Sequence, residues 1–307
     1  MGNISSLFEG GSEVTQRKKK ITFYTICATL ALMSILLLIL AGYAIISSLS
    51  GSTDSKTSLG ASTTITLTQQ DIYSGELLLL DATHPFVGKS ELVLISSERP
   101  KNEMGSNIYS ILGIQSLSLK PNVLKQFNAM ASDFYKQSND DNLLVFNAYD
   151  QTKSSQSAIY ESGTALQLGY YSQDDSGEFI RNESIYGNDT YSWIYENCHK
   201  YGFIVLENEA ETDNSGNSRG SNVFRYVGIP HAKVITERKI SFETYLEYLK
   251  ESSSYSSPLS TEVGSYKCAI YYLSANEPHT VPSKYEYTVS GNNSDGYIIT
   301  VAIPKNK

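Results

Sequence analysis

The chain has 307 residues, enough for one or two domains; 40% are hydrophobic and 18% are charged, which excludes a disordered or fibrous chain. Its net charge of −8 gives no basic footprint and so excludes a general nucleic-acid binder. Three Cys are too few for a disulfide scaffold or a Cys-rich zinc site.

Near the N-terminus, an uncharged apolar run predicts a transmembrane anchor. Ile21–Ile46 contains no charged residue, and its 26 residues are long enough to cross a bilayer with some tilt. The four basic residues 17–20 precede it directly, so the positive-inside rule places 1–20 in the cytoplasm and the bulk outside. A cleaved signal peptide is the alternative, but the apolar run is too long, and its best small-x-small site, Gly42–Ala44, has a bulky Tyr43 between the two small residues. The part expected outside carries a net charge of −10, because four basic and two acidic residues precede residue 49.

The rest of the chain indicates an α+β fold, a small antiparallel sheet with packed helices that follows one transmembrane helix. We expect a cytoplasmic tail over 1–20, an anchor over 21–48 and a Ser/Thr-rich linker over 49–74, whose residues 49–64 read as a flexible tether. The main domain then spans 75–250, and a C-terminal β extension of it spans 251–307. Helices and short strands interleave without βαβ regularity, which favours α+β over α/β.

Local patterns predict the individual elements. Apolar runs predict buried strands over 77–80, 143–146 and 203–206, and period-two patterns predict strands over 267–273, 286–289 and 297–303, the last two joined by the turn 290–296. An apolar stripe predicts a helix over 121–138 that begins with Pro121. A second helix is predicted over 193–201 with Gly202 at its end, and a third after the N-cap Ser241.

The sequence shows none of the common catalytic or phosphate-binding motifs. The sequence contains no P-loop, no G-x-G-x-x-G and no G-x-S-x-G, and its four His form no H-x-x-x-H pair. Cys198 and Cys268, both expected outside, could form a disulfide. The buried stripe of the 193–201 helix favours a free apolar thiol at Cys198, and the sequence leaves the question open.

Two segments resemble the VanY-type D-alanyl-D-alanine carboxypeptidases. The stretch 193–204 (WIYENCHKYGFI) is similar to that family's helix ending in H-K-Y-G-F, and 224–232 (FRYVGIPHA) to its segment E-P-W-H-F-R-Y-V-G. Further similarity covers 77–85, 121–149, 162–165 and the C-terminal part. The resemblance implies a zinc enzyme that removes the terminal D-Ala of peptidoglycan stem peptides. Such an enzyme needs two His and one Asp on zinc, a Glu that moves the proton, and an Arg that holds the substrate carboxylate.

Every one of these five positions carries a residue unsuited to its role. The two His positions are Tyr160 and Val223, the Asp position is Gln167, the general base is Gly220 and the Arg is Asp150. The sequence therefore predicts a pseudoenzyme with no catalytic residues, no bound cofactor and no zinc.

Three functions remain open: a membrane-tethered, non-catalytic binding or regulatory module at the cell wall, an active carboxypeptidase with relocated ligands, and a structural envelope protein. Glu161, His199 and Glu207 are the candidate relocated ligands. The expected partners are the membrane, through one helix, and an envelope protein or a peptidoglycan stem peptide. Since Asp150 would repel a carboxylate, we favour a protein partner.

Overall fold

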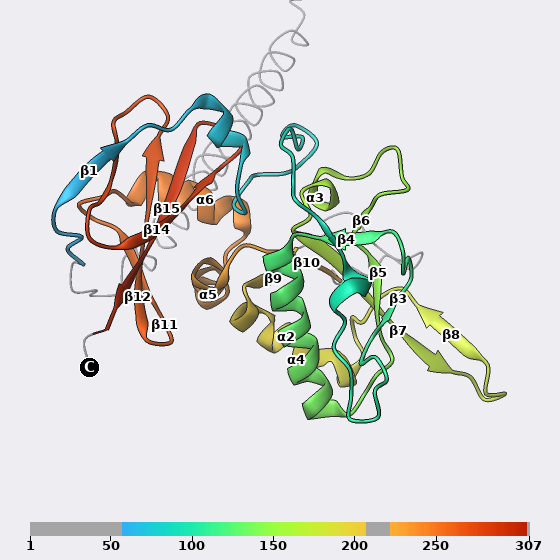
Figure 1. The fold of residues 1–307 in the computed structure, drawn as a ribbon. Helices are drawn as coiled ribbons and strands as arrows, with labels where there is room; N and C mark the ends of the chain where they lie inside the picture. The colour runs from blue at the N-terminus through green and yellow to red at the C-terminus, as the bar shows by residue number, and fades with distance from the viewer. Residues whose placement is uncertain (1–56, 207–221, 306–307) are drawn as a thin grey trace, which may run out of the picture. The chain divides into compact units, whose positions relative to one another are not determined.

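The computed structural model describes residues 57–206 and 222–305, and these residues form an α+β fold (Figure 1). The predicted tail 1–20 and anchor 21–48 lie outside the described residues, as does Gly220. None of the helices in the described part is long and apolar enough to span a bilayer. The α+β class predicted from the sequence is confirmed.

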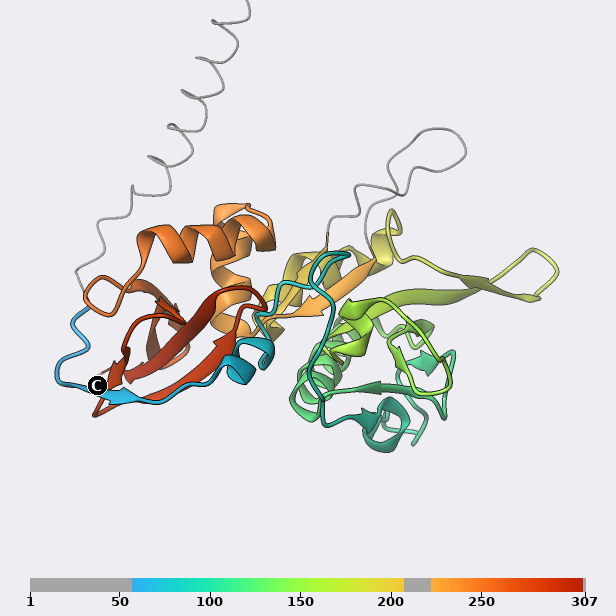
Figure 2. The same cartoon turned by 90° about the horizontal axis from the view of Figure 1, so that it is seen from above.

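A six-stranded sheet forms the centre of the predicted main domain. Its strands run in the order β3 (Ser110–Ile111), β5 (Leu143–Asn147), β7 (Ala165–Gln173), β10 (Val223–Tyr226) and β9 (Phe203–Val205), and β8 (Phe179–Asn182) pairs with the far end of β7. All pairs are antiparallel except β3–β5, which is parallel. The sheet is therefore mixed, whereas the sequence predicted a purely antiparallel one. Figure 2 shows the β7–β8 hairpin extending away from the other strands.

Helix α2 (Pro121–Ser138) has the predicted bounds and covers one face of this sheet. Pro121 occupies its first turn, where no backbone N–H is needed, and Asn139 ends it in the left-handed conformation. The helix α4 (Ser192–Asn197) continues as the 3-10 turn η4 (Cys198–Tyr201), and Gly202 ends it, as predicted. The first core forms here, from α2, α4 and the strands, and contains Phe127, Leu166 and Phe224, all fully buried.

A separate four-stranded antiparallel sheet forms the C-terminal part. Its order is β11 (Leu259–Val263), β12 (Tyr266–Ser274), β15 (Gly296–Pro304) and β14 (Glu286–Gly291), which confirms the three strands predicted there. Helix α5 (Ile229–Arg238) lies between the two sheets, and α6 (Phe242–Ser252) begins at the predicted N-cap Ser241 (Figure 1). The second core, which includes Ile204, Phe242 and Ile298, joins β9, these helices and the C-terminal sheet.

The first described residues are part of the fold, which differs from the expected linker over 49–74. Strand β1 (Ser62–Ile65) pairs with β13 (His279–Pro282), and the 3-10 turn η1 (Gln69–Tyr73) follows it. Leu59 and Ile72 are buried against the C-terminal sheet, so apolar burial fixes a segment whose Ser/Thr-rich composition suggested a tether.

The short elements between η1 and β7 complete the fold. Strands β2 (Val93–Leu94), β4 (Leu117–Leu119) and β6 (Tyr149–Asp150) form a three-stranded sheet. The 3-10 turn η2 (Ile95–Glu98) follows β2, and α3 (Ala158–Glu161) precedes β7.

The predicted strand over 77–80 is wrong, although Leu77 and Leu78 are buried. The backbone of 77–80 forms isolated hydrogen bonds and not the ladder of a strand pair. For example, the Leu79 N–H donates to the carbonyl of Asn292 at 3.0 Å. Cys198 and Cys268 are both free and buried. Burial raises the pKa of the Cys198 thiol to about 12, as expected for an apolar core thiol.

Candidate functional site

Strands β7 and β10 bring two of the sequence-predicted positions together. Gln167 and Val223 lie directly opposite each other across this antiparallel pair, and Ala165 lies opposite Arg225. Side chains that lie directly opposite each other in a strand pair point to the same face of the sheet. Side chains two residues apart along one strand also share a face. The four side chains therefore share one face, which we call the site face, while Leu166 and Phe224 point into the first core.

Tyr160 lies in α3, just before the tight turn that leads into β7. Gly163 in this turn has φ of 68°, and a Cβ there would collide with the side chain of Leu92. Lys120 N–H donates to the Gly163 carbonyl at 3.0 Å, and the hydroxyls of Ser162 and Thr164 pair at 2.6 Å. Both the backbone conformation and the available space therefore require glycine at this position.

Asp150, which the resemblance aligns with the substrate-holding Arg, lies in β6 of the sheet β2–β4–β6. Its carboxylate accepts hydrogen bonds from the hydroxyl and the N–H of Thr152. The Thr152 hydroxyl is the main reason why the Asp150 pKa lies below its usual range. This residue stays ionised near neutral pH, so it presents a negative charge where the resemblance implies a positive one.

The residues at the family's metal positions do not fit zinc. An amide oxygen is a weak neutral ligand, an isopropyl group is no ligand, and a phenol must lose a proton with a reference pKa of about 10. Within 57–206 and 222–305, no group of three or more His, Cys, Asp or Glu side chains is placed to hold a metal ion. Gln167 instead donates its amide N–H to the carbonyl of Glu183 at 3.4 Å.

Of the displaced donors considered from the sequence, Glu161 and His199 are described, and neither belongs to a group of three or more described His, Cys, Asp or Glu side chains that could hold a metal ion. His199 lies in η4, and its buried Nδ1 has no hydrogen-bond partner among the described residues. Burial, followed by the charge of Lys200, lowers the His199 pKa. Glu161 ends α3, and Glu207 lies outside the described residues.

Beside the site face lies a cavity of about 570 Å³ that the sequence did not reveal. We call it the β9 pocket; its wall consists of Asp81, Ile204, Val205, Leu206, Ile235, Ile240, Ser241, Phe242 and Glu243. Ile204 lies opposite Arg225, and Leu206 N–H donates to the Val223 carbonyl at 3.0 Å. The pocket therefore opens one strand away from Val223. Only the N-cap Ser241 was a local signal, and nothing in the sequence indicated that these segments meet.

Arg225 is the most deeply buried charge near the pocket, with 2% of its surface exposed. Its Nη2 donates to the Leu78 carbonyl, its guanidinium carbon lies 4.1 Å from the ring centroid of Phe242, and its Nε has no hydrogen-bond partner in the described structure. Burial lowers the Arg225 pKa to about 10, and Glu243 opposes that shift through its negative charge. The residue holds segment 77–78 and the start of α6 against β10.

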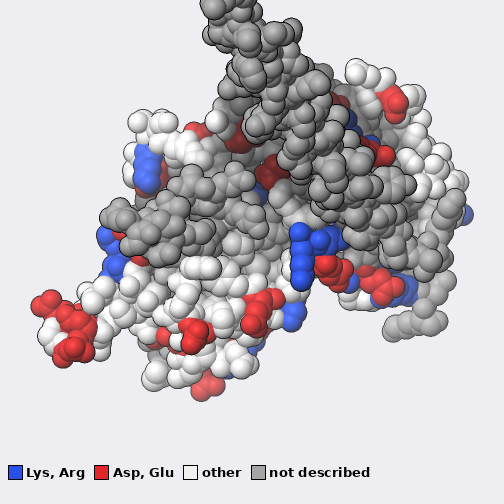
Figure 3. Space-filling view, turned by 180° about the vertical axis from the view of Figure 1, so that it is seen from behind, with Lys and Arg blue, Asp and Glu red and all other residues white. Residues whose placement is uncertain are grey.

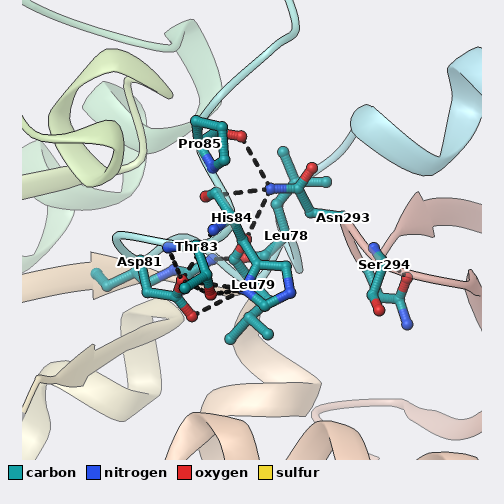
Figure 4. A network of polar contacts seen from close by, with 10 residues as sticks. Leu78, Leu79, Asp81, Thr83, His84, Pro85, Asn293 and Ser294 are labelled. Atoms are coloured by element: carbon teal, nitrogen blue, oxygen red, sulfur yellow. Dashed lines mark hydrogen bonds and ion pairs between the residues drawn. The ribbon is translucent and has the colours of Figure 1, made fainter.

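A polar network fixes Asp81, one of the residues that line the pocket (Figure 4). The Asp81 carboxylate accepts from the Thr83 hydroxyl at 2.7 Å and from the His84 N–H at 2.8 Å, and the Thr83 hydroxyl is the main reason its pKa is far below the usual range. On the other side of the same loop, the Asn293 side-chain N–H₂ reaches the Leu79 carbonyl at 2.8 Å and the Pro85 carbonyl at 3.1 Å. The loop is therefore held in place, with an ionised carboxylate facing the pocket.

Two curated proteins are similar to this chain. A D-alanyl-D-alanine carboxypeptidase of Enterococcus faecium is 30% identical over 245 residues, which cover 77% of this chain and 78% of that protein. A bifunctional D-Ala-D-Ala dipeptidase and D-Ala-D-Ala carboxypeptidase of Enterococcus gallinarum, VanXYC, is 29% identical over 93 residues, covering 30% of this chain and about half (48%) of that protein.

A solved structure shares the fold. The vancomycin resistance D,D-dipeptidase VanXYg, crystallised with a D-Ala-D-Ala phosphinate analogue, superposes with a TM-score of 0.58 at 22% identity and covers 79% of this chain and 100% of its own. No family model matches the sequence.

Proposed function

This chain belongs to the D-alanyl-D-alanine carboxypeptidase family, and we propose that it is a non-catalytic member that acts as a binding or regulatory module at the cell wall. The observation that carries the proposal is the pairing of Gln167 with Val223. This pairing supports the alignment of the family's metal positions with two residues that supply no strong ligand. The core face of the same strands keeps its large apolar residues, so the fold is maintained while the ligands are absent.

The proposed location is the outer side of the cell membrane, with the chain held by the segment 21–48. The basic residues 17–20 before the apolar run support this orientation. Relatives that act on D-Ala-D-Ala support peptidoglycan as the surroundings in which the module works. An envelope protein or a stem peptide is then the expected partner.

Metal content and product release test the proposal directly. The purified full-length chain, incubated with zinc and then desalted, should hold far less than one zinc per chain and release no D-Ala from stem peptides. The Enterococcus faecium carboxypeptidase serves as the positive control. One zinc per chain together with D-Ala release that a chelator abolishes would contradict the proposal and establish an enzyme with relocated ligands.

A restored variant sharpens this test. Tyr160→His, Gln167→Asp and Val223→His together should produce zinc binding, since they rebuild two imidazoles and a carboxylate at the aligned positions. Adding Gly220→Glu should be required before any D-Ala release appears, because a base must move the proton. The triple variant without measurable zinc would show that the backbone no longer presents these positions to one ion.

A further inference from the structure

Strand β8 is an edge strand that carries exposed apolar side chains. It pairs with β7 alone among the described strands, and the β7–β8 hairpin extends away from the rest of its sheet (Figure 1). Phe179 is 70% exposed and Ile180 is 44% exposed. Natural edge strands are commonly protected by Lys, Pro or a bulge, whereas β8 has the sequence FIRN and an unbroken register with β7. Such an edge is suited to pairing with a strand of another chain.

The backbone groups that face outward from β8 belong to Phe179 and Arg181. The Asp174 N–H donates to the Glu178 carbonyl at 2.9 Å and closes the hairpin. Hydrogen-bonded and non-hydrogen-bonded pairs alternate along an antiparallel ladder, so the pairs that contain Phe179 and Arg181 are not hydrogen-bonded to β7. Each of these two residues therefore turns its N–H and its C=O to the outer edge.

The other side of β7 supports this assignment. Tyr171 lies opposite Arg181, and its N–H donates to the Asn142 carbonyl on the β5 side at 2.9 Å. A strand residue turns its N–H and its C=O to the same side, so Tyr171 does not bond to Arg181. The outer edge of β8 thus presents two N–H and two C=O groups, arranged evenly about Ile180.

A second copy of β8 complements this edge when the two strands run antiparallel and are centred on Ile180. Phe179 of each copy then lies opposite Arg181 of the other copy, and the two pairs form four backbone hydrogen bonds. The two Ile180 side chains meet on the two-fold axis as a non-hydrogen-bonded pair, in which side chains approach most closely. Both exposed apolar side chains of β8 are covered in this arrangement.

The charges of the hairpin fit the same register. Arg181 is the only basic residue in 165–182, and Asp174, Asp175 and Glu178 lie at the end of the hairpin. The register brings Arg181 of one copy next to the acidic end of the other copy. It also places Glu178 opposite Asn182, so no acidic residue of the strand lies opposite another.

Arg181 can take this position without losing a strong interaction. Its guanidinium carbon lies 5.7 Å from the ring centroid of Phe146, and its side chain is 48% exposed. A planar guanidinium can stack on aromatic rings, so Phe179 of the second copy can add to this contact. The ion pair with Glu183, at 3.8 Å, is exposed and contributes little.

The two neighbouring symmetric registers are less favourable. Centring on Arg181 would place two like charges opposite each other. Centring on Phe179 would place Arg181 opposite Gly177, which has φ of 85° in the turn and cannot continue a strand pair. Only the register centred on Ile180 uses both outward-facing residues twice.

We propose that two copies of the chain associate through antiparallel pairing of β8 with β8, centred on Ile180, and form a two-fold symmetric dimer. A single strand pair buries less area than a standard interface, so we expect a weak, reversible dimer. The inference goes beyond the proposed function and does not depend on whether the chain binds zinc or a wall peptide.

Single cysteines test the register. The full-length chain with Cys27→Ser is the background, because Cys198 and Cys268 are buried. Ile180→Cys should form a disulfide between copies when a copper–phenanthroline oxidant is added, since directly opposed residues of a non-hydrogen-bonded pair have Cα atoms about 4.5 Å apart. Phe179→Cys and Arg181→Cys should cross-link at least about fivefold more slowly, because a shift of two residues separates each pair of like residues by about 8 Å. Met104→Cys, at a side chain that is 85% exposed outside the hairpin, measures cross-linking by collision.

Cross-linking at residue 179, 181 or 104 that is as fast as at 180, or none at 180, would overturn the proposal.

Sedimentation velocity of the full-length chain in detergent tests the dimer without cross-linking. Concentrations from about 1 to about 100 μM cover the range expected for a small interface. Ile180→Asp should raise the dimer dissociation constant about tenfold or more, because two carboxylates would face each other at the axis and lie diagonal to Glu178. Ile114→Asp is the matched control, since Ile114 is 49% exposed and lies outside the hairpin. A wild-type chain that stays monomeric, or a dimer that Ile180→Asp leaves as stable as Ile114→Asp does, would overturn the proposal and leave β8 as an edge for another protein.

Discussion

Two cores lie on opposite sides of β9 and β10, and they are stabilised in different ways. The first core, against α2, is closed by large apolar side chains such as Phe127, Leu166 and Phe224. The second core, against α5 and α6, is bordered by the site face, and two buried polar residues contact it: Arg225 stacks on Phe242, and His231 is bonded to Tyr245. Burial of apolar area is insensitive to pH, whereas buried titratable groups are not. The first core therefore maintains the fold, and the second is where stability depends on polar partners and solution conditions.

The charged groups at the molecular surface are distributed differently again. Seen from behind, Lys and Arg are scattered among acidic groups, while acidic side chains gather at the far end of the β7–β8 hairpin, whose turn contains Asp174, Asp175 and Glu178 (Figure 3). These charges lie away from both cores. Surface pairs such as Lys136–Asp133 contribute little to stability, so the comparison between the cores rests on buried groups.

The largest effect is expected for a substitution in the first core. Phe224→Ala should lower the free energy of unfolding by about 3–5 kcal/mol, because the fully buried ring packs 5.4 Å from Tyr195 and leaves a cavity. Its neighbour Val223, on the site face, should lose only about 1–2 kcal/mol in Val223→Ala. Urea denaturation at pH 7 measures both. Equal losses would show that the site face contributes to stability as much as the core face does.

A smaller effect is expected at Arg225, and its size depends on the replacement. Arg225→Ala should cost about 2–4 kcal/mol, since it leaves the Leu78 carbonyl without its donor and uncovers the Phe242 ring. Arg225→Met should cost less than Arg225→Ala, because it fills the space and removes a buried charge whose desolvation is unfavourable. The same denaturation experiment measures both variants. A methionine variant as unstable as the alanine variant would show that the charge itself, rather than the packed stem, stabilises the second core.

Local patterns predicted much of the fold but little of the candidate site. Helix α2 has its predicted bounds because its stripe and its terminal residues are encoded within 18 residues. The apolar run 77–80 lacks a strand because its backbone groups bond to Asn292 and Asn293, more than 200 residues away. The helix predicted over 193–201 buries Ile194 and Cys198 in the core, whereas its first residue, Trp193, is only partly buried.

The β9 pocket could not be predicted, since Asp81, Ile204 and Glu243 meet only in the folded chain. By contrast, motif spacing alone was enough to align Gln167 and Val223 with ligand positions of the family. The strand register places these two residues opposite each other. Local spacing along a strand is readable from sequence. Contacts that depend on how three distant segments pack are not.

The smallest effect is a pH dependence that should come from the second core. His231 is buried between the Tyr245 hydroxyl, 2.7 Å from Nδ1, and the Thr300 hydroxyl, 2.9 Å from Nε2. Each hydroxyl oxygen can accept a hydrogen bond from a ring N–H, so the charged ring would not lack acceptors. Burial of the ring therefore lowers the His231 pKa to about 3. The unfolded chain takes up this proton near pH 6.5, and the folded chain does not do so until about pH 3. Between these values the unfolded state binds more protons, so stability is lost as pH falls from about 6.5, by at most about 1.4 kcal/mol per pH unit from this group.

Urea denaturation at pH 7.5, 6 and 5 measures that slope. These values stay above about pH 4.3, where most carboxylates of the unfolded chain titrate. His231→Gln should flatten it, because an amide can both donate and accept between the two hydroxyls without titrating. His199→Gln is the matched control: the His199 pKa is lowered mainly by burial too, but the residue lies outside the second core. A wild-type slope that survives in His231→Gln, or that disappears equally in His199→Gln, would show that the pH dependence does not come from the second core.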